Sequence, residues 1–282
     1  MNDIVGTSHR IQTNNINVFV REAGPVDGPP VLLLHGWPDS SAMWRHQIAA
    51  LSAKGFHVIA PDLRGFGESD KPANVDDYAF LTTIADITGV LEHFGITAFQ
   101  VVGHDWGAFF AWALACFLPE RVQRLAVLSV GHPTAFGAAG WEQKEKSWYM
   151  LWFQFPGVAE SVFPADNWSR FRAFSRNGGG IDERIADLER PGALTASLAI
   201  YRANIDPASF GAAEGLELPK VACPTFAMWS SGDHFLTEQQ MTNSAAFVTG
   251  TWEYVRLEGG SHWIPIDHAE ECSTALLGFL AH

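Results

Sequence analysis

The sequence has few basic residues and no apolar stretch long enough to cross a membrane. Its 282 residues contain 18 Lys and Arg against 31 Asp and Glu, which gives a formal net charge of -13. Nucleic acids and anionic membranes are bound by clustered Lys and Arg, so this charge balance argues against both kinds of partner. The longest apolar run, residues 106–119, is shorter than the roughly 20 residues that a membrane-spanning helix needs.

Cysteine is also scarce. The three cysteines, Cys116, Cys223 and Cys272, are odd in number and far apart. This pattern indicates neither a disulfide framework nor a zinc site, and it is typical of a reducing compartment. The first ten residues, MNDIVGTSHR, contain no basic segment followed by an apolar run, so they do not resemble an export signal. We therefore expect a cytoplasmic protein.

Short apolar runs alternate with helical patterns through most of the chain. Strands are predicted at residues 16–24, 31–36, 56–62, 99–105, 124–130, 225–233 and 251–259. Helices are predicted at 40–55, 81–95, from 106 onward, 237–250 and from 268 onward. We expect the first strand to be antiparallel. The others are nearly continuous in apolar residues, which predicts a mostly parallel sheet covered by helices on both faces.

Residues 132–215 differ in character from the rest. Strand-like runs disappear, and Trp, Phe and Tyr cluster on helix-like stretches. We predict a helical cap inserted into an α/β core that is formed by residues 1–131 and 216–282. The cap is expected to cover the carboxyl ends of the parallel strands, where ligands bind in open α/β sheets. The segment 174–182, FSRNGGGID, is interpreted as a surface turn, with a mobile loop near the entrance as the alternative.

The segment VVGHDWG, residues 101–107, places a carboxylate at the centre of a strand–turn–helix pattern. The pattern G-x-S-x-G is the nucleophile elbow of the α/β-hydrolase fold, and Asp105 stands where serine is expected. Gly103 and Gly107 permit the tight turn. The following helix points its free N–H groups at the carboxylate and favours its ionised form. The alternative is that Asp105 only caps the helix.

Partners for Asp105 are present in the chain order of this fold, which is nucleophile, acid, histidine. Asp233 ends the strand after the insertion, and His262 lies in the loop after the next strand. The other position for the acid, after the strand that follows the nucleophile helix, reads Ser-Val-Gly-His at 129–132 and has no carboxylate. Three residues in three expected places favour a triad over helix capping.

An oxyanion hole needs backbone N–H groups that point at the oxygen where charge develops. We assign it to the amides of Trp37, which follows the buried strand 31–36, and Trp106, next to Asp105. A cis peptide bond before Pro38 is a further hypothesis. The spacing of His35, His104 and His132 gives no metal motif, so we expect structural histidines and no metal or cofactor.

Three segments together resemble one branch of a known superfamily. HGWPDSSAMWRHQ (35–47), APDLRGFGESDKP (60–72) and GHDWGAFFAWALACFLPERV (103–122) are similar to the epoxide hydrolases and haloalkane dehalogenases of the α/β-hydrolase superfamily, whose nucleophile is aspartate. Soluble epoxide hydrolases also carry two cap tyrosines that hold the epoxide oxygen. The segments YMLWFQFPGVAE and LAIYRAN match their surroundings, which implies this role for Tyr149 and Tyr201.

The resemblance implies that an epoxide is opened to a vicinal diol in two steps. Asp105 would attack an oxirane carbon to form an alkyl ester, while Tyr149 and Tyr201 protonate the leaving oxygen. Water activated by His262, which Asp233 orients, would then hydrolyse the ester. The expected partners are an apolar small-molecule epoxide and water. The expected pocket residues are Trp37, Trp106, Trp148, Trp152 and Phe153.

Other functions use similar parts. A haloalkane dehalogenase would use the same triad with halide-binding N–H donors from Trp106 and either Trp148 or Trp152, although Trp37 stands where many of these enzymes carry asparagine. Fluoroacetate dehalogenases need arginines beside the nucleophile, where this chain has apolar side chains. A ligand-binding receptor on this scaffold would not require a complete triad. A serine esterase would require serine at position 105.

Overall fold

The computed structural model describes residues 4–176, 178–210 and 217–281. One sheet of eight strands has the order β1-β2-β4-β3-β5-β6-β7-β8. The strands are β1 (Thr7–Thr13), β2 (Ile16–Ala23), β3 (Pro30–Leu34), β4 (His57–Pro61), β5 (Phe99–His104), β6 (Val122–Leu128), β7 (Thr225–Ser230) and β8 (Trp252–Leu257). The seven strands predicted from the sequence are all present.

Strand direction also follows the prediction. β2 pairs antiparallel with β4, and the pairs from β4 to β8 across the sheet are parallel. β4, β5 and β7 are buried along their whole length, which explains their continuous apolar sequences. β1, which pairs antiparallel with β2, was not predicted. Its sequence, TSHRIQT, is polar and mostly exposed, so it lacks the apolar signal of the other strands.

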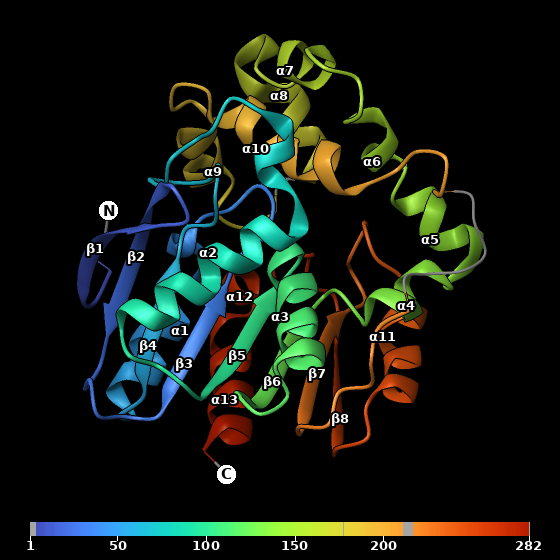
Figure 1. Cartoon of the computed structure of the whole chain (residues 1–282). Coiled ribbons are helices and arrows are strands. Elements are labelled where there is room, and N and C mark those ends of the chain that lie inside the picture. Colours follow the sequence, from blue (N-terminus) through green and yellow to red (C-terminus); the bar gives the residue numbers. More distant parts are fainter. Residues whose placement is uncertain (1–3, 177, 211–216, 282) are drawn as a thin grey trace.

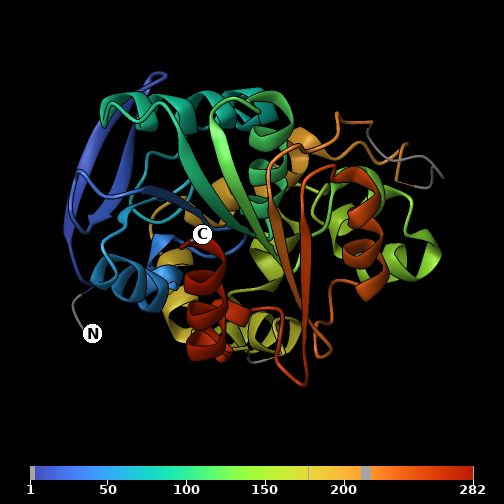
Figure 2. The ribbon, with the colours of Figure 1, turned by 90° about the horizontal axis from the view of Figure 1, so that it is seen from below.

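Helices cover both faces of the sheet. In Figure 2, α2 and α3 lie on one side of the strands, and α1 and α13 lie on the other. The core helices are α1 (Arg45–Ala53), α2 (Phe80–His93), α3 (Trp106–Phe117), α11 (Glu238–Thr242), α12 (Ile264–Asp267) and α13 (Ala269–Leu280), with 3-10 turns η1 (Ser41–Trp44), η2 (Val75–Tyr78) and η3 (Asn243–Phe247). The single helix predicted at 237–250 is therefore two shorter pieces. The Ser244 hydroxyl donates to the Gln240 carbonyl, a bond that competes with regular helix geometry at this junction.

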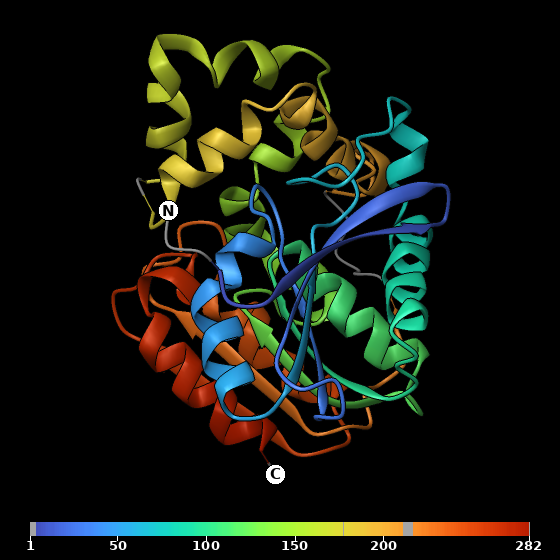
Figure 3. The ribbon, with the colours of Figure 1, turned by 90° about the vertical axis from the view of Figure 1, so that its left-hand side faces the viewer.

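Between β6 and β7 the described residues form helices and connecting loops. These helices are α4 (Pro133–Gly137), α5 (Gly140–Lys146), α6 (Tyr149–Trp152), α7 (Val158–Val162), α8 (Ala165–Phe174), α9 (Ile181–Leu188) and α10 (Ala193–Asn204). Figures 1 and 3 show α6 to α10 above the ends of the strands, and we refer to α5–α10 as the cap helices. The predicted boundary at residue 215 lies outside the described residues. None of the described helices is both long and apolar enough to cross a bilayer.

Candidate active site

Asp105 lies between the end of β5 and the start of α3, in a turn that is strained at the backbone. Its φ of 53° and ψ of -124° are rare for a residue with a side chain. Glycines make this turn possible. A Cβ on Gly103 would lie 2.6 Å from the backbone of Ala108, and one on Gly36 would lie 2.6 Å from the nitrogen of Trp106. The sequence pattern around Asp105 therefore reflects close backbone approach on both sides of the turn.

Backbone amides hold the Asp105 carboxylate. The Trp37 N–H donates to Oδ1 at 2.7 Å, and the Trp106 N–H also hydrogen-bonds the carboxylate. The peptide bond between Trp37 and Pro38 is cis, as the sequence analysis hypothesised. Two amides that converge beside one carboxyl group form an arrangement that can stabilise an oxyanion on that group.

His262 connects Asp105 to Asp233. Its Nδ1–H donates to Asp233 Oδ2 at 2.8 Å, and its Nε2 lies 3.6 Å from Asp105 Oδ2. The other oxygen of Asp233 accepts the N–H groups of Phe235 at 2.8 Å and Leu236 at 3.0 Å. The hydrogen bonds of Asp233 fix the orientation of the imidazole, so that Nε2 faces Asp105.

The charges of this cluster are strongly coupled. Burial alone would lower the pKa of His262, but the charge of Asp233 and hydrogen bonds to Asp105 and Asp233 outweigh it and raise the pKa to about 10. Burial alone would raise the pKa of Asp105, but the hydrogen bond and charge of His262 lower it below its usual value. At neutral pH the resting site therefore contains an ionised Asp105 beside a protonated His262.

Two further side chains hold the backbone of His262. His104 Nε2 and Ser129 Oγ both donate to the His262 carbonyl, at 2.9 Å and 3.0 Å. Burial and the charge of His262 lower the pKa of His104 to about 4, so its ring is neutral. Ser129 directly follows β6, at the other position where this fold can carry its acid. It contributes a hydroxyl donor to the histidine loop instead.

Tyr149 on α6 and Tyr201 on α10 lie close to this cluster. Their exposed fractions are 7% and 2%, and their rings contact each other at 6.0 Å between centroids. The Tyr201 hydroxyl interacts with Trp106 and with Tyr149. Burial raises the pKa of both phenols well above 10, and the negative charge of Asp105 raises it further. Both tyrosines are therefore neutral O–H groups within electrostatic reach of the carboxylate.

The predicted pocket residues do not share one environment. The rings of Trp37, Trp106 and Phe153 each contact the Tyr201 ring, at 5.9, 5.2 and 5.0 Å between centroids. Trp152 contacts Phe153 at 5.5 Å, one layer further from Tyr201. Trp148 is 53% exposed and packs on Trp152.

Phe235 is an aromatic neighbour of the site that sequence reasoning missed. Its ring lies 5.5 Å from the imidazole of His262 and 5.6 Å from the ring of Tyr149. It therefore contacts both the histidine beside Asp105 and one of the two buried tyrosines. Its position two residues after Asp233 was an available signal, because that segment enters the site with the acid. Phe174 on α8, which also contacts Tyr149 at 5.6 Å, carried no such signal.

Comparison with known proteins shows the family of the chain. The model of the family described as alpha/beta hydrolase fold matches residues 29–269. The chain belongs to the α/β-hydrolase family. It is 29% identical to epoxide hydrolase A of Mycobacterium tuberculosis over 97% of this chain and 97% of the relative. It is 31% identical to an epoxide hydrolase of Caballeronia sordidicola over 99% of this chain and 95% of the relative.

Solved structures of the family superpose over nearly the whole chain. An epoxide hydrolase of Bacillus megaterium in complex with an inhibitor aligns with a TM-score of 0.87 and 28% identity, covering 97% of this chain and 100% of the other. Epoxide hydrolase A of Mycobacterium thermoresistibile aligns with a TM-score of 0.84 and 28% identity, covering 98% of each chain. The α/β-hydrolase fold predicted from the sequence is confirmed.

Proposed function

We propose that this member of the α/β-hydrolase family is an epoxide hydrolase that opens an apolar epoxide to a vicinal diol. The observation that carries the proposal is the pairing of an ionised nucleophile, Asp105, with two buried and neutral phenols, Tyr149 and Tyr201. Opening a strained ether needs a nucleophile on carbon and an acid on oxygen. The relatives named above carry the name of this activity.

In the first step Asp105 attacks an oxirane carbon, and the carbon–oxygen bond of the ring breaks. The oxygen takes a proton from Tyr149 or Tyr201, which leaves a tyrosinate and an alkyl ester on Asp105. An ionised carboxylate needs no base for this attack. Protonated His262 stays out of the bond changes of this step.

The second step follows from the change in charge. Once Asp105 is an ester, it no longer contributes the negative charge and hydrogen bond that help to hold the proton on His262. The His262 proton can then pass to the tyrosinate, and His262 becomes neutral. It then takes a proton from the water that attacks the ester carbonyl, and the Trp37 and Trp106 amides stabilise the tetrahedral oxyanion. Asp233 stabilises the imidazolium. As the intermediate collapses, the leaving alkoxide takes the proton from His262 and becomes the diol, and the new carboxyl group of Asp105 then gives its proton to His262, which restores the resting site.

The contacts of the indoles argue against a haloalkane dehalogenase. The Trp37 Nε1–H donates to Ser197 Oγ at 3.2 Å, and Trp106 hydrogen-bonds Tyr201. Trp148, a predicted alternative donor, is more than half exposed. Indole N–H groups with these contacts are poorly placed to hold a halide, whereas the tyrosines have the right protonation state for an oxygen leaving group.

A substrate pair tests the proposal. The protein is incubated separately with styrene oxide and with 1-bromobutane, and the diol and free bromide are measured. We expect diol from the first substrate and no bromide from the second. Bromide release without diol formation would assign the chain to the dehalogenases, and neither product across a wider panel of both substrate classes would favour a receptor.

The domain division and location are part of the same proposal. We propose that residues 132–215 form a cap on a core of residues 1–131 and 216–282, with Trp37, Trp106, Trp148, Trp152 and Phe153 around the substrate.

We also propose that the enzyme acts in the cytoplasm, because Cys116, Cys223 and Cys272 are all free thiols in the structure. Fluorescence of a tagged chain in intact cells tests the location.

A further inference from the structure

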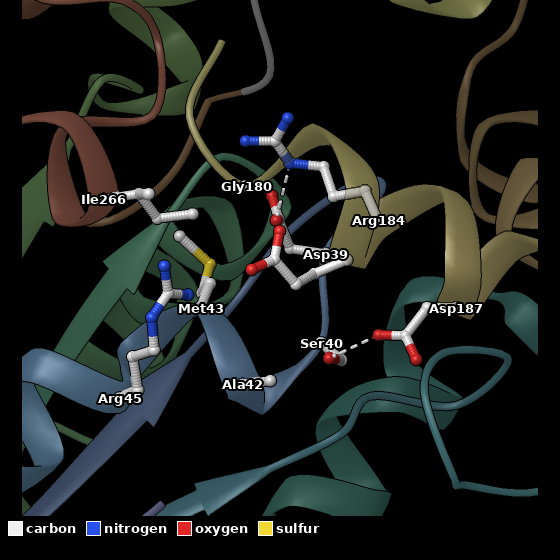
Figure 4. Close-up of a pocket in the computed structure, with 10 residues that line it drawn as sticks. Asp39, Ser40, Ala42, Met43, Arg45, Gly180, Arg184, Asp187 and Ile266 are labelled. Atoms are coloured by element: carbon white, nitrogen blue, oxygen red, sulfur yellow. Dashed lines mark hydrogen bonds and ion pairs between the residues drawn. The ribbon is translucent and has the colours of Figure 1, made fainter. Parts of the chain in front are cut away.

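A buried ion pair joins the cap helices to the core beside the site. Arg184 on α9 donates from Nε to Asp39 Oδ1 at 2.9 Å, and the two side chains are 2% and 3% exposed. One turn further along α9, Asp187 accepts a hydrogen bond from Ser40 Oγ at 2.7 Å. Figure 4 shows both contacts at the seam between α9 and the loop that follows β3.

The same arginine also contacts the loop that carries the catalytic histidine. Its guanidinium lies over the ring of Trp263, 3.8 Å from the centroid, and Trp263 Nε1–H donates to the other oxygen of Asp39 at 2.8 Å. The remaining guanidinium nitrogens donate to the carbonyls of Gly178 and Gly179. Arg184, Asp39 and Trp263 thus form a closed triangle in which both oxygens of Asp39 are used.

The triangle touches two loops that each carry a catalytic group. Asp39 lies two residues after Trp37, whose amide donates to Asp105. Trp263 directly follows His262, whose Nε2 faces Asp105. Arg184 therefore pairs with Asp39 in the loop that carries the Trp37 amide, and it stacks on Trp263 in the loop that carries His262. It does not touch the reacting atoms itself.

The glycines before α9 make this contact close. A Cβ on Gly178 would lie 2.7 Å from an atom of the Trp263 ring, and the Gly179 N–H donates to Asp267 Oδ1 at 2.9 Å. The segment does contain turns, and Arg176 and Asp182 within it are exposed, as interpreted from the sequence, but Gly178 is buried. The sequence pattern missed its role because the neighbour, Trp263, is distant along the chain. Asn177 lies outside the described residues.

We propose that Arg184 is a positioning residue for ester hydrolysis. Through its contacts with Asp39 and Trp263 it fixes the positions of the Trp37 amide and the His262 ring on either side of Asp105. This inference rests on the proposed epoxide hydrolase function. Both positioned groups act when water attacks the ester. The acids of ring opening, Tyr149 and Tyr201, lie on α6 and α10, and neither belongs to the triangle. Loss of Arg184 therefore slows the second step more than the first.

The test uses Arg184→Met and the double variant Arg184→Met with Asp39→Asn. The double variant leaves no unpaired buried charge and keeps an acceptor for Trp263, so it carries the test if the single variant fails to fold. The third variant is Arg184→Lys, which keeps the positive charge but lacks the planar guanidinium group and its several N–H donors. The matched control is Arg64→Met, because Arg64 forms an equally buried pair with Asp86 at 2.7 Å between the β4 loop and α2.

In a single-turnover experiment with styrene oxide, samples are quenched at successive times. The mass of the intact protein in each sample measures how much ester is present on Asp105. We expect ester decay to slow by roughly tenfold or more, while ester formation stays within about threefold of the unmodified protein. The control keeps both rates. Equal slowing of both steps, or unchanged decay in a folded variant, overturns the proposal.

Amide hydrogen exchange gives a second readout that needs no turnover. We expect faster exchange in peptides around Trp37 and around His262 in the Arg184 variants, and no change there in Arg64→Met. If the unmodified protein forms no diol, the proposed function fails by itself. Unchanged exchange in both loops overturns the positioning role in that case too.

Discussion

The two halves of the site solve different problems with different side chains. The core half holds charge, because an ionised Asp105 lies beside a protonated His262, and backbone amides and Asp233 fix their positions. The cap half holds neutral phenols among aromatic rings, and the pKa values of Tyr149 and Tyr201 are raised well above 10. An ionised carboxylate beside neutral phenols is the arrangement that the proposed ring opening needs at neutral pH. The predictions below separate the contributions of the two halves.

The largest effect is expected when the core half loses His262, the proposed base. His262→Gln should leave ester formation intact, because Asp105 attacks without a base, and should lower steady-state diol formation by about 10³ to 10⁴-fold. Intact mass measured after adding epoxide should show the protein plus one substrate. Full steady-state activity in this variant would remove His262 from the mechanism.

A smaller effect is expected in the cap half, where two acids share one task. Tyr149→Phe and Tyr201→Phe should each lower the rate of ester formation by about tenfold, and the double variant by about 10² to 10³-fold. Quenched-flow measurement of ester formation checks this. The hydrolysis of an ester already formed should change little. If the double variant forms ester at the normal rate, the cap tyrosines do not act as acids.

The smallest effect is expected on the free energy of unfolding, whose pH dependence reports the charge of His262 in the core half. The folded-state pKa of His262, about 10, lies above the ordinary value of 6.5. A group with a raised pKa contributes stability that is fully present below pH 6.5 and is lost as pH rises through 10. The free energy of unfolding should therefore fall more steeply between pH 7 and 10 in the unmodified protein than in His262→Gln. Denaturant unfolding at several pH values measures both slopes, and parallel slopes would contradict the charged pairing.

The two halves also differ in how far sequence predicts them. Asp105 and Asp233 each follow a buried strand, and His262 follows the edge strand β8. Parallel strands bring the positions after their carboxyl ends to one edge of the sheet. Their approach to one another could therefore be predicted. Tyr149 and Tyr201 were found only through the family resemblance, since one tyrosine among many cap aromatics has no local signal.

The individual hydrogen bonds and ion pairs between cap and core could not be predicted from the sequence. The hydrogen bond from Trp37 to Ser197 joins residues 160 positions apart, and the pair Arg184–Asp39 joins residues 145 positions apart. Such contacts depend on how the cap helices pack on the strand ends. The periodic pattern of apolar residues in the sequence does not indicate this packing. The polar strand β1 was missed for a simpler reason, because only one of its residues is buried.

The central claim is that oxygen from Asp105, rather than from water, enters the diol in the first turnover. A single turnover with excess enzyme in ¹⁸O-labelled water tests this most directly. The account predicts an unlabelled diol and a peptide containing Asp105 that is heavier by one ¹⁸O, because water attacks the ester carbonyl. Label in the diol with an unlabelled Asp105 peptide would mean that water opens the epoxide directly, and the covalent mechanism would be wrong.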